Sequence, residues 1–136
     1  MSAHPLIQRL LDEFHYPMLT TDTVDDFVAA HEYSVLFFTE EPVKVKEALD
    51  VAVVLPELVS VFPQLHAAVI DRDSEKQLQG RYHFVTWPAL VFLKRGDFLG
   101  SIIKIQNWDD YLHQIPEILQ RKPQPVEPVA SAVTPE

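Results

Sequence analysis

The segment 35–38 restricts the fold of this chain more than any other. Its residues favour β-structure and are apolar at consecutive positions, so both faces of a strand over about 34–39 must be buried. Such a strand is typical of an α/β sheet, in which functional loops tend to follow the carboxyl ends of the strands. The loop that follows here contains Glu40, Glu41 and Pro42, so its chemistry is the first functional question.

Apolar periodicity and turn residues predict alternating helices and strands along the rest of the chain. A helix is expected over about 6–14, before Pro17, and another begins at Thr23, whose first turn carries acids that suit the helix dipole. Gly96-Asp97 predicts the turn of a hairpin. The other expected elements are strands at 18–20, 65–71, 89–93 and 98–105 and helices at 73–82 and 109–120, the last capped by Asn107 and weakened by Pro116.

The segment 41–62 allows two interpretations. Asp50 could cap a helix that continues through Val61, but Pro56 would then remove one internal hydrogen bond. Alternatively, Pro56 occupies the first turn of a shorter helix over 55–62. We favour the shorter helix, with 41–54 irregular or loosely helical.

Composition excludes several classes of function. The 136 residues suit one domain, expected over 1–120, and the proline-rich segment 121–136 predicts a disordered tail. A formal charge of −9 without a basic stripe argues against nucleic-acid binding and would attract a basic partner, although excess acid also simply favours solubility. No signal-peptide core or membrane-spanning stretch is present, so a soluble cytoplasmic protein without membrane insertion is expected.

The side chains needed for most catalytic chemistry are missing. The sequence has no cysteine, which removes thiolate nucleophiles, disulfides and thiolate metal ligands. Its six histidines are scattered rather than at metal-ligand spacing, and three glycines are too few for a phosphate-binding loop. Glu40 and Glu41 are adjacent, so they are surface acids rather than a catalytic pair. We therefore expect no enzymatic activity, no cofactor and no metal.

The segment 80–115 resembles the second half of thioredoxin. It has a helix ending in a tyrosine, an X-Pro pair before an apolar strand, a Lys-x-Gly turn, a second strand and an amphipathic helix. The resemblance covers about 20–120 and implies a thioredoxin-like mixed sheet with helices on both faces. It also implies a cis Trp87–Pro88 bond, although only ~5–6% of X-Pro bonds in folded proteins are cis. The family's redox cysteines would fall within 42–45 and its buried acid at Leu36, so its redox chemistry is lost.

A narrower resemblance extends over nearly the whole chain except the tail. The segments TEEPVKVKEALD, ELVSVFP, AAVIDRDSE and YHFVTWPALVFLKRGDFLG together resemble the HyaE/HoxO/HupG-type hydrogenase expression proteins, which are thioredoxin-like and lack the redox cysteines. This resemblance implies a chaperone for a membrane-bound nickel–iron uptake hydrogenase. The implied partner is the small-subunit precursor with its twin-arginine signal peptide, with other hydrogenase accessory proteins as further partners.

A twin-arginine leader joins two guanidinium groups to an apolar run, so an acidic rim beside an apolar surface would complement it. The expected contacts are Glu40, Glu41, Glu47 and Asp50 for the arginines, with Trp87 and Pro88 as the apolar floor. Solvated surface acids and a core tryptophan are the competing interpretations. Two other functions remain open, a redox-inert adaptor for an unrelated assembly and a metal-delivery factor, the latter disfavoured by the scattered histidines.

Overall fold

The computed structural model describes residues 4–40 and 46–126. Helices and strands alternate along the chain as the apolar periodicity predicts. In chain order they are α1 (Pro5–Asp12), β1 (Met18–Leu19), α2 (Val24–Ala30), β2 (Tyr33–Phe38), α3 (Glu47–Val61), β3 (Leu65–Ile70), η1 (Arg72–Ser74, a short 3-10 helix), α4 (Glu75–Tyr82), β4 (Ala89–Lys94), β5 (Asp97–Ile103) and α5 (Trp108–Leu119).

The strands form one mixed sheet in the order β1-β3-β2-β4-β5. β1 and β2 run parallel to β3, whereas β4 runs antiparallel to both β2 and β5. The centre of the sheet is β2, which is fully buried from Ser34 to Phe38. The prediction of a strand buried on both faces is therefore confirmed.

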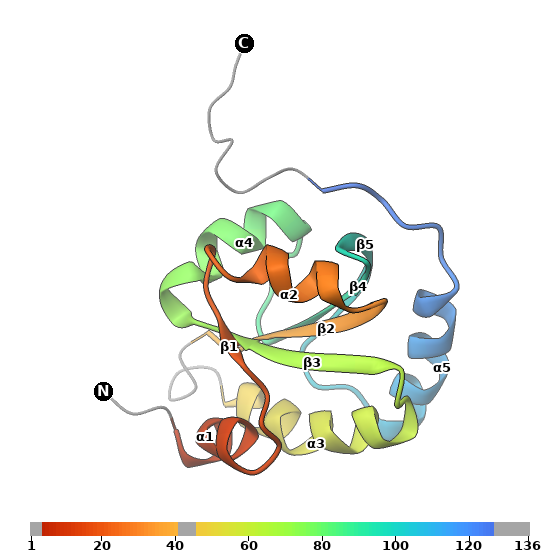
Figure 1. Ribbon diagram of the computed structural model, residues 1–136. Helices are drawn as coiled ribbons and strands as arrows, with labels where there is room; N and C mark the ends of the chain where they lie inside the picture. The colour runs from red at the N-terminus through yellow and green to blue at the C-terminus, as the bar shows by residue number, and fades with distance from the viewer. Residues whose placement is uncertain (1–3, 41–45, 127–136) are drawn as a thin grey trace.

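Helices cover both faces of the sheet (Figure 1). On one face, Val35 and Phe37 pack into a core cluster with residues of α1, α3 and α5. On the other face, Leu36 and Phe38 pack into a second cluster with residues of α2 and α4. Successive side chains of a strand point to opposite faces, so a strand between two helical layers must be apolar at every position.

The prediction of a short helix over 55–62 is wrong. α3 begins at Glu47 and continues through Pro56 to Val61, so residues 47–54 are helical rather than irregular. The helix buries Ala48, Val51, Ala52, Leu55 and Leu58 on its inner face. A proline inside a helix costs about 3 kcal/mol, whereas each fully buried aliphatic side chain contributes about 1.5–3 kcal/mol. Packing on the sheet therefore outweighs the lost hydrogen bond.

The other elements differ from prediction only at their ends. The hairpin turns at Arg95-Gly96, where Gly96 has a φ of 89°, and β5 already begins at Asp97. Asn107 precedes α5 as predicted, but its side chain makes no capping hydrogen bond. No helix in the described parts of the chain is long and apolar enough to span a bilayer.

The described chain follows α5 as far as Val126. Gln124 forms an isolated bridge to β5, with hydrogen bonds of 2.7 and 2.8 Å between its main chain and that of Phe98. Val126 packs against the core cluster of α2 and α4. Within the tail predicted over 121–136, residues 121–126 thus have tertiary contacts, whereas 127–136 lie outside the described residues.

Candidate partner-binding site

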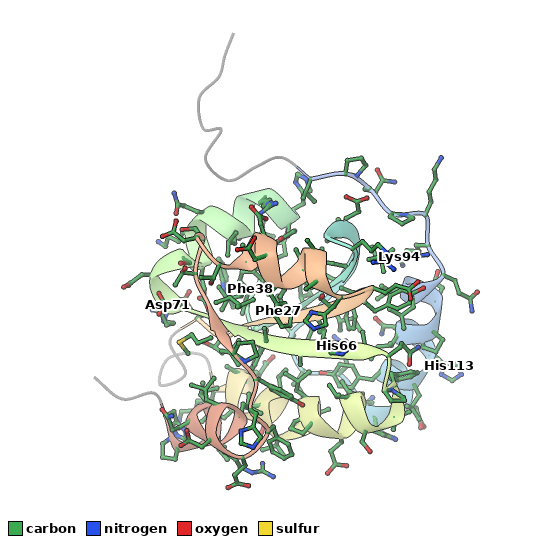
Figure 2. The ribbon with its side chains drawn as sticks, in the orientation of Figure 1. Phe27, Phe38, His66, Asp71, Lys94 and His113 are labelled. Atoms are coloured by element: carbon green, nitrogen blue, oxygen red, sulfur yellow. The ribbon has the colours of Figure 1, made fainter. Side chains whose placement is uncertain are left out.

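The end of β2 lies beside the start of β4 and the end of β5. Phe38 pairs with Ala89, and Ala89 pairs with Ile103. Figure 2 shows Phe38 and Asp71, which follows β3, toward one end of the sheet, and Lys94 of β4 toward the other. We call the surface at the first end the carboxyl edge, and it comprises residues 39–40, 71–75, 85–88 and 103–105 together with the first turn of α3, 47–50.

Pro88 anchors the chain beside β5. The Trp87–Pro88 bond is cis, so that prediction is confirmed. Pro88 is buried, and its carbonyl oxygen accepts a hydrogen bond of 2.7 Å from the Lys104 N–H. Lys104 has a φ of 61°, in the left-handed region, where the chain leaves β5. Because it is buried, Pro88 offers a partner little of the apolar floor expected of it.

Trp87 is half-buried, so it is neither the fully exposed apolar floor nor the core tryptophan that the sequence allows. Its ring packs edge-on against Phe84, with 5.3 Å between ring centroids, and its indole Nε1 is buried without a hydrogen-bond partner. Val85, two residues earlier, is 80% exposed. The apolar surface of this connection is therefore formed by Val85 and part of Trp87.

Glu75 fixes the main chain at the start of the β2–α3 connection. Its carboxylate accepts hydrogen bonds from the Thr39 N–H at 2.8 Å and from the Glu40 N–H at 3.1 and 3.2 Å. Arg72 lies 3.6 Å from the Glu75 carboxylate and 3.7 Å from that of Glu40. Glu40 itself has a φ of 56°. A left-handed glutamate is unfavourable, and the Glu75 carboxylate offsets this cost by binding its N–H.

Burial raises the pKa of Glu75 to about 7, although the N–H groups of Thr39 and Glu40 and the Arg72 guanidinium favour its charged form. A carboxyl group that titrates near neutral pH could serve as a proton donor or acceptor. Leu36, where thioredoxins have their buried acid, is buried and apolar as the resemblance implies. With no thiol anywhere in the sequence, Glu75 has no redox group to assist.

The other predicted acids differ in how available they are. Glu47 is half-buried, and its Oε1 accepts a hydrogen bond of 3.3 Å from the Ile105 N–H, which joins α3 to the chain after β5. Asp50 is exposed one turn later. Glu41 lies outside the described residues. The fold thus brings Glu40, Glu47 and Trp87 to one edge, with Asp50 beside them.

Sequence reasoning missed two features of this edge. The sequence places Glu75 in the helix expected at 73–82, and its position after an acidic turn gives no sign that it is buried. Val85 and Ile103 are exposed apolar side chains at this edge. Single apolar residues beside a strand are ordinary in any sequence, so no pattern distinguishes them.

The described residues contain no group of three or more potential metal-binding side chains. The fold does bring two scattered histidines together. His31 at the end of α2 stacks on His66 of β3, with 4.1 Å between ring centroids, and both lie near Phe27, as Figure 2 shows for His66 and Phe27. His31 Nδ1 lies 2.9 Å from the Phe27 carbonyl oxygen. Stacked rings direct their nitrogens alongside one another rather than toward one ion.

Comparison with solved structures shows the thioredoxin fold. The chain resembles mitochondrial thioredoxin 3 from Saccharomyces cerevisiae with a TM-score of 0.64 and 17% identity, over 76% of this chain and 96% of the other. A crystal structure of a putative hydrogenase expression/formation protein HupG from Rhodopseudomonas palustris aligns with a TM-score of 0.56 and 41% identity, over 76% and 94% of the two chains.

Sequence comparison identifies a narrower group. The chain is 51% identical to the hydrogenase expression/formation protein HoxO of Azotobacter vinelandii, over 85% of this chain and 78% of the relative. It is 38% identical to HupG of Rhizobium leguminosarum bv. viciae, over 81% and 77%. Residues 6–111 match the family model described as hydrogenase-1 expression protein HyaE. With this match, these relatives and a thioredoxin-like fold without cysteine, the chain belongs to the HyaE family of hydrogenase expression proteins.

Proposed function

We propose that this protein is a non-catalytic chaperone for a membrane-bound nickel–iron uptake hydrogenase. It binds the small-subunit precursor in the cytoplasm and holds the twin-arginine leader at the carboxyl edge until the precursor is ready for export. The names of the HoxO and HupG relatives support a role in hydrogenase expression or formation. That the leader is the segment bound goes beyond those names and is part of this proposal.

The observation that carries the proposal is the meeting of acids and apolar side chains at the carboxyl edge. Glu40 and Asp50 supply carboxylates for guanidinium groups, and Val85 with Trp87 supplies an apolar surface. Arginine–carboxylate pairs are strong and directional because two N–H groups can bind one carboxylate. The hydrogen bonds from the Thr39 and Glu40 N–H groups to Glu75 hold the Glu40 main chain in place, which lowers the entropy lost on binding.

The side chains at this edge favour binding over catalysis. Thiol–disulfide exchange needs a thiolate, and the sequence has no cysteine. The buried Glu75 carboxyl already binds two main-chain N–H groups and lies beside Arg72, so its contacts explain it as a support for the edge.

Calorimetric titration tests this proposal. The probe is the synthetic leader peptide of the cognate hydrogenase small subunit, titrated at two salt concentrations beside the same peptide with both arginines replaced by glutamine. We expect binding that weakens at high salt and is lost with the arginines, because both effects follow from charge pairing.

Charge reversals locate the contact. Asp50→Lys should weaken binding about tenfold, the effect of losing roughly 1.4 kcal/mol of interaction energy. Glu32→Lys is the matched control, since Glu32 is an exposed acid that precedes β2 at the opposite end of the sheet. If neither peptide binds, the leader is not the target, and an adaptor role in another assembly becomes the better explanation.

A further inference from the structure

A shallow hollow lies on the outer side of α3, beyond the carboxyl edge. Its volume is about 340 Å³, and it is lined mainly by α3, with contributions from α1, the turn after α1 and the start of α5. Three large apolar side chains that line it are strongly exposed: Val53 by 45%, Val61 by 47% and Trp108 by 40%. An exposed cluster of this kind is typical of an interaction surface.

The outer face of α3 is unusual for a helix that packs on a sheet. The inner face supplies the core, and polar side chains are the norm on the opposite face. Here Val53 and Val61 lie on the exposed face, and Pro56 adds a ring to the hollow. Pro56 has no N–H, so the Ala52 carbonyl lacks its normal helical hydrogen bond. The proline lowers the stability of the helix, and the exposed valines lower the solubility of the protein. Neither feature adds to the core.

The lining of the hollow carries one cation and one anion, Arg9 and Glu57. Arg9 is the cation of its lining, and it already pairs with Glu13 at 3.5 Å and lies 5.0 Å above the Phe14 ring. Glu57, also in the lining, makes no ion pair with any described residue. The hollow therefore combines apolar side chains with a carboxylate that has no ion-pair partner among the described residues.

The hollow continues directly from the acidic rim along one helix. Asp50 belongs to the first turn of α3, and the exposed positions 53, 57 and 61 follow it at intervals of three or four residues, on one side of the helix. From Asp50 to Val61 the helix rises about 16 Å, which is the length of about five extended residues. A peptide with basic residues at one end and an apolar run next to them could place its basic residues at Asp50 and its apolar run along positions 53, 57 and 61.

We propose that the outer face of α3 is the docking groove for the apolar run of the leader, with the arginines of the same peptide at the carboxyl edge. This inference rests on the proposed function and assigns the apolar run of the leader to a surface other than Val85 and Trp87. At the carboxyl edge Trp87 is half-buried and Val85 is a single exposed side chain, whereas Val53, Val61 and Trp108 line one hollow together.

A second copy of this chain fits the groove less well. Each copy has a formal charge of −9 and would bring Glu57 and Asp50 to the interface. Like charges placed against one another oppose association. A leader peptide with basic and apolar residues complements both the charge and the apolar surface.

The test is titration of the leader peptide into Val53→Asp and Val61→Asp. Both residues are about half-exposed, so these variants should fold, which far-ultraviolet circular dichroism checks. We expect roughly tenfold weaker binding for each, since the burial of a valine is lost and a carboxylate is left against an apolar segment. Ala29→Asp is the control because Ala29 is exposed on α2, which covers the opposite face of the sheet from α3.

Two peptides and one hydrodynamic measurement separate the outcomes. A leader whose apolar run is replaced by serine and glutamine should bind wild type as weakly as the natural leader binds Val53→Asp. If wild type binds the natural leader and both α3 variants bind it equally well, the groove is wrong while the proposed function stands. If wild type does not bind the leader, the proposed function itself fails. Sedimentation that changes from dimer to monomer in Val53→Asp would assign the groove to a second copy and overturn the inference.

Discussion

Glu75 connects the end of β3 to the start of the β2–α3 connection. Its side chain is buried at the first position of α4, and it binds the N–H groups of Thr39 and Glu40 across 36 and 35 residues of sequence. A buried carboxylate is unfavourable unless hydrogen bonds and charges compensate it, and here two N–H groups and Arg72 offset part of the cost of burial. The geometry of the carboxyl edge at Glu40 therefore depends on one distant side chain.

The raised pKa of Glu75 predicts a pH-dependent stability. Its pKa is about 7 in the folded protein against an ordinary value of 4.5, so between these values the folded state keeps a proton that the unfolded state loses. The free energy of unfolding should fall as the pH rises from 4.5 to 7, by at most about 1.4 kcal/mol per pH unit, and this contribution should be constant above 7. Urea unfolding of wild type and Glu75→Gln at several pH values measures it.

The variant lacks the titrating group, so its stability relative to wild type should improve through that pH window. Glu32→Gln, an exposed site, serves as the control and should show no such trend. A constant difference between Glu75→Gln and wild type across the window from the ordinary to the raised pKa would contradict the raised value.

The helix α3 contributes to the core, to the carboxyl edge and to the outer hollow. Its inner face supplies five buried residues to the core, its first turn carries Glu47, which binds the Ile105 N–H, and its outer face lines the hollow. These contacts place two of the predicted acids, Glu47 and Asp50, and the apolar hollow on one helix. The spacing between the two surfaces is therefore set by helix geometry rather than by a loop.

Replacing Pro56 with alanine should stabilise the protein. The substitution Pro56→Ala restores an N–H donor to the Ala52 carbonyl and removes the ring, and the expected gain in the free energy of unfolding is about 1–3 kcal/mol. Urea unfolding measures the gain. Pro116→Ala in α5 is the matched variant, because Pro116 is also inside a helix but outside the hollow.

Leader binding distinguishes these two proline variants. Both should be more stable than wild type, whereas only Pro56→Ala should alter the affinity for the leader, since only Pro56 lines the groove. A loss of stability in Pro56→Ala would mean that the proline ring contributes packing that outweighs the missing hydrogen bond.

In the molecule as a whole, two core clusters on opposite faces of the sheet support an edge at which acids and apolar side chains meet. The redox loop of thioredoxin has lost its cysteines, yet the cis proline and the strand order around it remain. The chain after α5 also belongs to the folded unit as far as Val126, through Gln124 and Phe98.

Two truncations test where the folded unit ends. Ending the chain after Val126 should leave the free energy of unfolding unchanged. Ending it after Lys122 removes both Phe98–Gln124 hydrogen bonds and the packing of Val126, and should lower it by about 1–3 kcal/mol. Equal stability of the two truncated chains would place the end of the folded unit at the end of α5, in agreement with the boundary predicted at residue 120.

The sequence by itself determined the order of helices and strands, the doubly buried β2, the hairpin and the absence of thiol chemistry. Resemblance to thioredoxin added the cis bond at Pro88. These features depend on residue type, on periodicity and on near neighbours in the chain. Only the tertiary structure decided that α3 continues through Pro56, that Pro88 and Glu75 are buried, and that Val53, Val61 and Trp108 share one hollow. Each of these depends on which surfaces the packing covers, and packing joins residues that are far apart in the sequence.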